Sequence, residues 1–459
     1  MDIEDRIKTG WGAADITPRG GKISLVGQWH ERITDIIRDP IMANAMVLQT
    51  SRGRTIWVAC DLCAVSKPLY DETKRLLRAS LPGFNDDELI LSATHIHTGP
   101  GTDNNPFLRL LNRDSPNAIQ TEECRRQAAL GIERAVRDAV ESLAETRFEI
   151  AVSYTITGVN RRVSYKNGTG AMYGDITKPD FSGMEGRDGG PIQILYARRA
   201  SDGEMTGVIA AVPCTAQADE NADYVTADYW AAARGVIKNK FGSHVVALGL
   251  IRSSGDLSPH TRVDGGKLIE PISGEKGAVE MGKRIGDAVV RAAGEIITSY
   301  GPEAAYKHMK ITEPLPFWTA DKNEYEAAKK FVSAADTNNL ESLSDRMAHS
   351  NANAKIMRYE SGITEYSADF HALRIGDVVF ITNPFEMYIE YADRIRAACP
   401  DAQIIDVQLA GDDCLGYLPT QKAINAGGYS TMMFNCFFNA EGGDAVVEKS
   451  VGLIKSIMK

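Results

Sequence analysis

This chain of 459 residues lacks three features that would place it at a membrane or on a nucleic acid. No apolar run approaches the roughly 18 residues of a membrane-spanning helix. Residues 1–8 have neither the basic start nor the apolar core of a secretion signal, so we expect a cytoplasmic protein; a secreted form whose signal has been removed is the alternative. The net charge of -10 argues against a nucleic-acid backbone or an anionic membrane surface as the main partner.

A disulfide framework is absent too, because the seven cysteines are an odd number scattered along the chain. Cys60 and Cys63 have the spacing of a CxxC motif, but no second pair accompanies them, so we interpret both as packed thiols. The sequence contains no internal repeat, no low-complexity block and no linker. We therefore expect a single domain over residues 1–459, and leave open whether it forms a homo-oligomer.

The pattern of apolar residues is that of an α/β protein. Strand-like segments at 56–60 and 88–92 alternate with amphipathic helical segments at 67–79 and 121–143. The alternation continues with strands at 208–212, 245–250, 378–382 and 403–408, and with helices at 227–240, 275–297 and from about Pro384 onward. This order predicts a mixed β-sheet sandwich core with surrounding helices. Residues from about 320 to 357 are rich in Ala, Lys, Glu, Asp and Asn, which predicts a helical excursion on the surface.

Two histidines, His95 and His97, follow the predicted strand at 88–92 and precede a Gly-Pro-Gly turn. Side chains two residues apart on a strand point the same way, so both imidazoles can converge on one ion. The glycines of the turn, Gly99 and Gly101, allow a ligand to approach the backbone at the edge of the sheet. The alternative is a pair of hydrogen-bonded structural histidines.

Further candidate residues lie on loops that follow predicted strands. Ser258, near the end of the polar loop 251–260, is either a nucleophile, a donor to substrate or part of a Ser-Pro turn. Glu386, in the first turn of a predicted helix, either complements the helix dipole or binds a metal. Arg161 or Arg162 holds an anion or a carbonyl, or is a solvated loop arginine. Cys214, after a buried strand, is a metal-binding thiolate or a buried structural cysteine.

Tyr417 and Tyr429 are candidates for contact with a ligand or substrate, and packing is the alternative role for each. They are twelve residues apart.

Taken in order, these stretches resemble the motifs of the neutral/alkaline ceramidase family. The matching stretches are Gly12-Ala13-Ala14-Asp15-Ile16-Thr17-Pro18, Thr94-His95-Ile96-His97-Thr98-Gly99-Pro100, Asn160-Arg161-Arg162, Gly255-Asp256-Leu257-Ser258-Pro259-His260, Pro384-Phe385-Glu386 and the pair Tyr417 and Tyr429. Six weak motifs in the same order over nearly the whole chain make the resemblance specific. It implies the fold of the family's N-terminal catalytic domain.

The resemblance also implies roles for individual residues. It makes His95, Glu386 and Tyr417 zinc ligands, and it places His97 beside the metal, where it would orient or deprotonate the water that the metal activates. Arg161 and Tyr429 would stabilise the developing oxyanion, as donors aimed at a reacting carbonyl do. Ser258 would contact the substrate or act as nucleophile.

The sequence departs from the family at its second zinc histidine. The corresponding turn here is Pro213-Cys214-Thr215, which contains no histidine. Either Cys214 replaces that ligand, or Gln217, Asp219 or His260 reaches in, or the site binds metal weakly or not at all. In this respect the chain resembles a bacterial, ceramidase-like subset more than the true ceramidases.

We also expect the protein to lack the C-terminal immunoglobulin-like domain and the secretion signal that are usual in the family. We therefore expect a zinc-dependent hydrolase that cleaves the amide bond of an N-acylated, small, soluble molecule rather than ceramide. The alternatives are an ester, lactone or glycoconjugate hydrolase on the same scaffold, or a non-catalytic small-molecule binding protein that has lost the metal.

Overall fold

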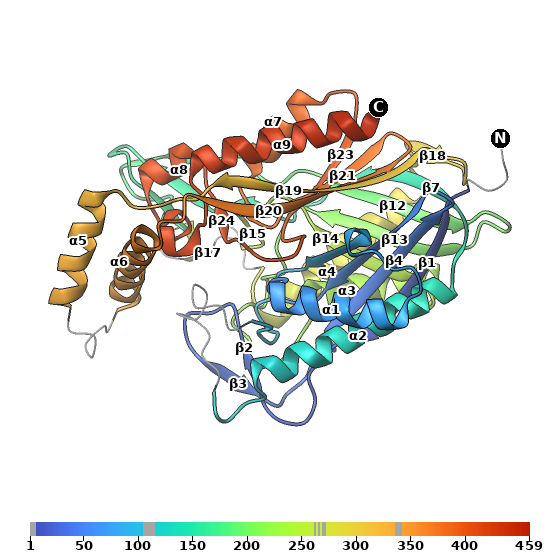
Figure 1. The fold of residues 1–459 in the computed structure, drawn as a ribbon, viewed down its shortest axis with the longest axis horizontal. Helices are drawn as coiled ribbons and strands as arrows, with labels where there is room; N and C mark the ends of the chain where they lie inside the picture. The colour runs from blue at the N-terminus through green and yellow to red at the C-terminus, as the bar shows by residue number, and fades with distance from the viewer. Residues whose placement is uncertain (1–5, 104–114, 261–262, 265–266, 269–271, 336–341) are drawn as a thin grey trace.

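A computed structural model describes residues 6–103, 115–260, 263–264, 267–268, 272–335 and 342–459. Two β-sheets lie face to face in the middle of the molecule, and helices cover the outer face of each (Figure 1). The predicted mixed β-sheet sandwich with surrounding helices is therefore confirmed. Among the described residues, no helix has both the length and the apolar character needed to cross a bilayer.

The larger sheet is mixed and has the strand order β14-β13-β12-β7-β1-β4-β5-β6, with β18 paired to β7. Its strands are β1 (Lys8–Asp15), β4 (Met42–Thr50), β5 (Gly53–Cys60), β6 (Leu89–Ala93), β7 (Ala144–Ser153), β12 (Ile192–Arg199), β13 (Met205–Val212), β14 (Val246–Ile251) and β18 (Thr298–Tyr300). The helices α1 (Lys67–Ser80), α2 (Thr121–Glu141), α3 (Tyr229–Phe241) and α4 (Gly274–Ala292) contribute to the core on its outer face.

The smaller sheet has the order β19-β20-β21-β23. Its strands are β19 (Tyr306–Pro316), β20 (Glu365–Ile375), β21 (Val378–Thr382) and β23 (Gln403–Val407), and its outer face packs against α7 (Ile389–Ala398) and α9 (Ala440–Met458). Both faces of the larger sheet are buried, and its side chains alternate between them. On β4, Ala45 and Val47 face the helices, whereas Met46 and Leu48 face the second sheet. Trp57 and Phe380 join the two sheets, with ring centroids 5.5 Å apart.

Short strand pairs and turns at one end of the sandwich carry most of the loops singled out in the sequence. They are β2 (Ile23–Leu25) with β3 (Arg32–Thr34), β8 (Val159–Asn160) with β15 (Leu257–Ser258), β9 (Arg162–Tyr165) between β10 (Gly170–Met172) and β11 (Phe181–Met184), β16 (Val263–Asp264) with β17 (Lys267–Leu268), and β22 (Glu386–Met387) with β24 (Tyr417–Leu418). The chain also forms a short helix, α8 (Gln421–Ala426).

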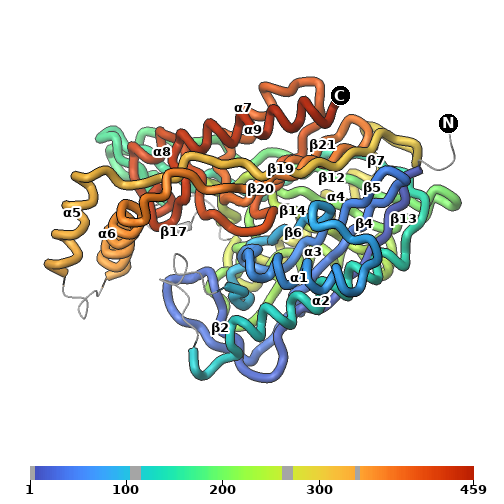
Figure 2. The backbone as a smooth tube through the Cα atoms, viewed as in Figure 1, coloured from blue at the N-terminus to red at the C-terminus, as the bar shows by residue number. Residues whose placement is uncertain are grey.

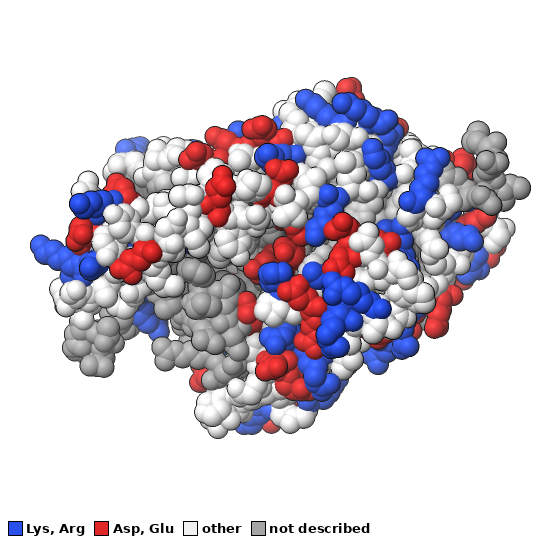
Figure 3. Space-filling view, in the orientation of Figure 1, with Lys and Arg blue, Asp and Glu red and all other residues white. Residues whose placement is uncertain are grey.

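The segment predicted as a helical excursion contains α5 (Lys322–Ala334) and α6 (Leu343–Ser361), which project together from one end of the molecule (Figures 1 and 2). Residues 336–341 of this segment lie outside the described residues. On the face shown in Figure 3, acidic and basic side chains are interspersed along α1 and α2. They form ion pairs such as Lys67 with Asp71 at 3.1 Å, so no single sign of charge dominates these helices.

The predicted helix from about Pro384 begins later than expected. Glu386 and Met387 instead form β22, which pairs in parallel with Tyr417 and Leu418 of β24. Helix α7 starts at Ile389, whose backbone N–H donates to Asp256 Oδ1 at 2.9 Å. A side chain distant in sequence therefore supplies a partner at the helix start, which the local pattern does not reveal.

Candidate active site

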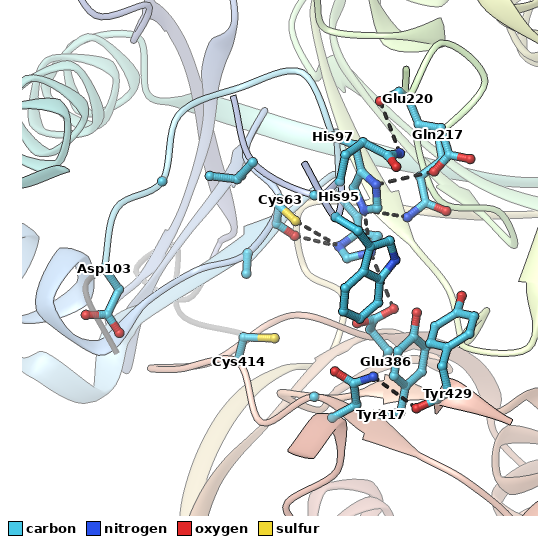
Figure 4. A pocket seen from close by; sticks show the side chains of 18 of the residues that line it. Cys63, His95, His97, Asp103, Gln217, Glu220, Glu386, Cys414, Tyr417 and Tyr429 are labelled. Carbon is cyan, nitrogen blue, oxygen red and sulfur yellow. Dashed lines mark hydrogen bonds and ion pairs between the residues drawn. The ribbon is translucent and has the colours of Figure 1, made fainter. Parts of the chain in front are cut away.

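A pocket of about 390 Å³ opens where the loop after β6 meets the β22–β24 pair (Figure 4). Its volume lies within the range of small-molecule sites, roughly 300 to 1,000 Å³. Seven of the residues given a possible catalytic or metal-binding role in the sequence line it: His95, His97, Arg161, Gln217, Glu386, Tyr417 and Tyr429. The fold therefore gathers residues that are up to about 330 positions apart in the chain around one cavity.

His95 lies two residues after β6 and has a φ of +62°, in the left-handed region that non-glycine residues rarely adopt. Two neighbours hold this turn: the backbone N–H of His95 donates to Leu62 O at 2.9 Å, and Thr94 Oγ1 donates to Asp61 Oδ1 at 3.1 Å. His95 Nδ1 lies 2.6 Å from Cys63 O, so this nitrogen carries the proton and donates. The lone pair of the neutral ring is then on Nε2, which faces the pocket.

The His97 ring lies beside that of His95, with the two Nε2 atoms 3.4 Å apart. Its Nδ1 lies 3.3 Å from Glu220 Oε2, and its Nε2 lies 2.7 Å from Gln217 Nε2. Glu220 also lies 3.2 Å from His260 Nε2 through its other oxygen. Gly27 leaves room for the His97 ring, since a Cβ at this position would come within 2.3 Å of His97 Cγ.

Glu386 completes the group from the other side of the pocket. Its Oε2 lies 3.4 Å from His95 Nε2 and, among the described residues, has no hydrogen-bond donor. Burial raises the pKa of Glu386, but the neighbouring His95 outweighs this effect and holds the pKa below its usual value. A buried, ionised carboxylate oxygen without a donor is in the state that a cation would stabilise.

Arg161, in the second half of the pocket, is buried and donates to three surrounding oxygen atoms. Its Nη2 donates to Gly255 O at 2.9 Å and to Tyr417 OH at 3.3 Å, and its Nη1 donates to Tyr173 OH at 3.0 Å. The rings of Tyr417 and Tyr429 meet edge to face, with centroids 5.9 Å apart. A guanidinium and two phenols thus stand next to the Glu386 carboxylate.

Two residues singled out in the sequence lie elsewhere. Ser258 is buried behind Tyr173, with its Oγ 3.1 Å from Tyr173 OH, and it is outside the pocket lining. Cys214 packs in the core between the larger sheet and its helices, and its Sγ lies 3.4 Å from Thr215 O. The structure therefore does not bring Cys214 to the candidate site. Burial also raises the pKa of its thiol well above the usual value, which disfavours the thiolate that binds metals.

The sequence interpretation missed Cys63, Glu220, Tyr173 and Trp29, all of which line the pocket. Ligand atoms of Cys63, His95 and His97 all lie within 4.8 Å of one another, so these residues form a possible His/Cys site. Burial raises the pKa of the Cys63 thiol, but the adjacent His95 and His97 lower it to about 6. The parallel pairing of β5 with β6 brings Cys63 and His95 to the same edge of the sheet. Two neighbouring parallel strands, each followed by a metal-binding residue type, are the sequence signal that could have indicated this.

The donor set fits a zinc ion. Zn–N and Zn–O bonds of about 2.0 to 2.1 Å at tetrahedral angles place two ligand atoms about 3.3 to 3.4 Å apart. The separation of His95 Nε2 and Glu386 Oε2, 3.4 Å, matches this value. The imidazole of His95 is also held in the required tautomer by a second partner, as metal-binding histidines usually are.

The arrangement of sheets and helices is similar to two solved structures. Against the crystal structure of neutral ceramidase from Pseudomonas aeruginosa the TM-score is 0.72, with 19% identity over 98% of this chain and 75% of that one. The chain has the neutral ceramidase fold. A structure described as ceramidase complexed with C2 gives a TM-score of 0.71 at 16% identity, over 99% of this chain and 75% of that one.

In sequence, 96 residues are 31% identical to the neutral ceramidase of Pseudomonas aeruginosa, which corresponds to 20% of this chain and 14% of that protein. No protein-family model matches the chain. The resemblance to neutral ceramidases inferred from the motifs is confirmed at the level of the fold.

Proposed function

We propose that this protein is a zinc-dependent hydrolase that cleaves an amide bond in an N-acylated small molecule. The observation that carries the proposal is the pairing of His95 Nε2 with the donor-free Glu386 Oε2 at 3.4 Å, in a pocket of the neutral ceramidase fold. His95, Glu386 and Tyr417 would hold the ion. When bound, zinc supplies a Lewis acid that polarises the carbonyl to be attacked.

Residues of the chain supply the remaining stabilisation. Arg161 is fixed by the carbonyl of Gly255 and by two tyrosine hydroxyls, so its charge is already oriented before substrate binds. Together with Tyr429 it would donate to the carbonyl oxygen as negative charge develops there. Donors positioned in advance are worth roughly 10²- to 10³-fold in rate each, because they need no reorganisation during the reaction.

The walls of the pocket suggest how a substrate lies. Trp29 packs edge to face against Tyr429 and Phe434, with both centroid distances 6.1 Å, and Met347 of α6 and Phe437 extend the same apolar wall. We propose that an apolar acyl or aryl group lies along this wall. The polar part of the substrate would then face Gln217 and Glu220 on the opposite side.

One observation favours the alternative of a non-catalytic small-molecule binding protein. Gln217 Nε2 lies 2.7 Å from His97 Nε2 and satisfies that nitrogen without any metal. The two functions differ in a measurable way, because only the hydrolase requires an ion at His95 and Glu386.

The test combines metal analysis with an activity screen on protein purified without chelator. We expect about one equivalent of zinc per chain, and less than ~0.2 equivalents in His95→Ala and Glu386→Gln. The matched control is His244→Ala, which removes an exposed histidine outside the pocket. Full zinc occupancy in both site variants would refute the proposed ligands.

The activity screen uses N-acyl aminocoumarins of increasing acyl length beside matched coumarin esters. We expect hydrolysis of the amides by the zinc-loaded protein, and a loss of at least about 100-fold in kcat/KM in Glu386→Gln and Arg161→Met. Turnover of the esters alone would assign the site to an esterase. Zinc-loaded protein that binds the amides without cleaving either series would support the binding protein.

A further inference from the structure

The two imidazoles of the loop after β6 face each other through their unprotonated nitrogens. His95 Nδ1 donates to Cys63 O at 2.6 Å, and His97 Nε2 lies 2.7 Å from the amide nitrogen of Gln217 while its Nδ1 lies 3.3 Å from the Glu220 carboxylate, so the proton of each neutral ring belongs on Nδ1. The lone pairs are then on the two Nε2 atoms, which are 3.4 Å apart. An N–H of Gln217, 2.7 Å from His97 Nε2, occupies one of these lone pairs in the absence of metal, and a cation bound to both nitrogens would take its place.

The Nε2–Nε2 distance also has the value that a shared ion requires. Two histidine nitrogens bound to one tetrahedral zinc at about 2.0 to 2.1 Å lie about 3.3 to 3.4 Å apart. His95 Nε2 has the same separation, 3.4 Å, from Glu386 Oε2. His95 therefore has a potential co-ligand on each side, at the spacing that a tetrahedral ion sets.

We infer that His97 is a direct metal ligand through Nε2, beside His95 and Glu386, and that Glu220 is its positioning residue. The inference rests on the proposed metal site and deepens it. It assigns the second histidine ligand to the neighbouring position of the same turn, whereas Cys214 remains in the core. A His-x-His turn alone supplies both imidazoles.

Glu220 is placed to fix the His97 ring. Its Oε2 lies 3.3 Å from His97 Nδ1, and its Oε1 lies 3.2 Å from His260 Nε2. His260 is in turn anchored, with its Nδ1 2.9 Å from Ile272 O. A carboxylate behind the distal nitrogen of a histidine ligand fixes its tautomer and ring orientation and increases its basicity.

Gln217 controls access to this ligand. Its Nε2 lies 2.7 Å from His97 Nε2, and its Oε1 accepts a hydrogen bond from Thr215 Oγ1 at 3.0 Å, which orients the amide. The amide N–H thus uses the lone pair that would bind the metal. Metal binding requires this amide to rotate away, so Gln217 lowers the affinity of the site.

The experiment measures zinc affinity of the full-length apo-protein by competition with a chromophoric chelator, and the visible spectrum after loading with Co²⁺. We expect His97→Ala to weaken zinc binding at least about 100-fold and to change the Co²⁺ spectrum, and Glu220→Gln to weaken binding about 10- to 100-fold. Gln217→Ala should bind zinc more tightly, an effect that misfolding does not produce. His244→Ala is the control for surface histidines.

The outcomes separate this inference from the proposed function. If His95→Ala and Glu386→Gln lose zinc while His97→Ala keeps the affinity and Co²⁺ spectrum of the wild type, His97 is not a ligand and the proposed site stands. If none of the three variants loses zinc, both proposals fail. A thiolate charge-transfer band of bound Co²⁺ that disappears in Cys63→Ser would assign the ligand to Cys63 and overturn the role of His97. Unchanged affinity in Gln217→Ala would refute the role of Gln217.

Discussion

Arg32 is a buried cation that joins the two sides of the His97 turn, and its removal makes a testable prediction. It lies on β3 and is 4% exposed. Its Nη1 donates to the carbonyls of Glu220 and Ala222 at 2.9 and 2.8 Å, and its Nη2 donates to those of Val26 and His97 at 3.0 and 2.5 Å. One side chain therefore fixes the backbone of His97 and of Glu220 at the same time.

The Arg32→Met variant keeps much of the side-chain volume and removes all four hydrogen bonds. Hydrogen bonds from a charged donor contribute about 1.5 to 3 kcal/mol each, but most of that sum is offset because the guanidinium no longer has to be dehydrated on folding. We expect the free energy of unfolding to fall by about 3 to 5 kcal/mol, because four carbonyl oxygens lose their donor at roughly 1 to 3 kcal/mol each before this offset. For 459 residues the entropy of unfolding is about 1 kcal/mol per kelvin, so Tm should fall by about 3 to 5 °C.

Differential scanning calorimetry of the apo-protein measures this change, and Arg38→Met is the matched control. Arg38 is on the same side of the molecule and pairs with the exposed Glu275 at 3.1 Å, so its loss should change stability by about 1 kcal/mol or less. Zinc affinity of Arg32→Met should also fall, because the turn that carries His97 loses its anchor. If the Tm of Arg32→Met equals that of Arg38→Met, the reasoning about this cation is wrong.

Three further predictions concern stability and the pocket. Asp61 accepts hydrogen bonds from both Nη atoms of Arg234, at 2.6 and 2.8 Å, and from Thr94 Oγ1. Asp61→Asn should therefore lower the free energy of unfolding, measured by calorimetry, by about 3 to 5 kcal/mol. A loss below about 1 kcal/mol would contradict this. Burial lowers the pKa of His308 to about 4, so the unfolded state binds the proton first and stability is lost as pH falls from 6.5 towards 4. In urea titrations at pH 6.5 and pH 4, His308→Gln should reduce this loss of stability by about 1 to 2 kcal/mol. The effect is smaller than the full pKa shift of His308 implies, because the ring is partly exposed. If the variant and the wild type lose the same stability, His308 does not cause the loss. Trp29→Ala should raise KM for long N-acyl substrates about tenfold and leave short ones nearly unchanged, since it removes the apolar wall; an equal change for both would argue against the proposed position of the acyl group.

The sequence pattern predicts the elements that repeat a clear period. The helix expected at 67–79 is α1, Lys67–Ser80, and the strand at 378–382 is β21. By contrast, β19 was missed because its sequence mixes Lys, His and Glu with two prolines, and it is strand only through its eleven paired residues with β20. Such an edge strand depends on its partner rather than on its own residues.

Sequence analysis singled out the pocket residues that lie within short local motifs. His95, His97, Glu386 and the two tyrosines line one pocket, and their chemical roles stay predictions. Cys63 was missed because the CxxC motif has no second pair and both thiols were interpreted as packed, whereas the position of Cys63 depends on the parallel register of β5 and β6. Glu220 gave no local signal, since its contact with His97 joins residues 123 positions apart.

The backbone of His95 is in the left-handed region, as are those of Tyr173, Asp228 and Leu409. A left-handed non-glycine residue costs about 1 to 3 kcal/mol, so the contacts around it must hold it in place. Here the strain places Nδ1 against Cys63 O and directs Nε2 towards a carboxylate oxygen without a donor. Three features therefore lie at the same point of the pocket: the strained backbone of His95, the fixed tautomer of its ring and the Glu386 oxygen without a donor. A bound cation would stabilise the donor-free carboxylate oxygen, so zinc loading should raise Tm, and the rise should grow with the free zinc concentration and be lost in Glu386→Gln.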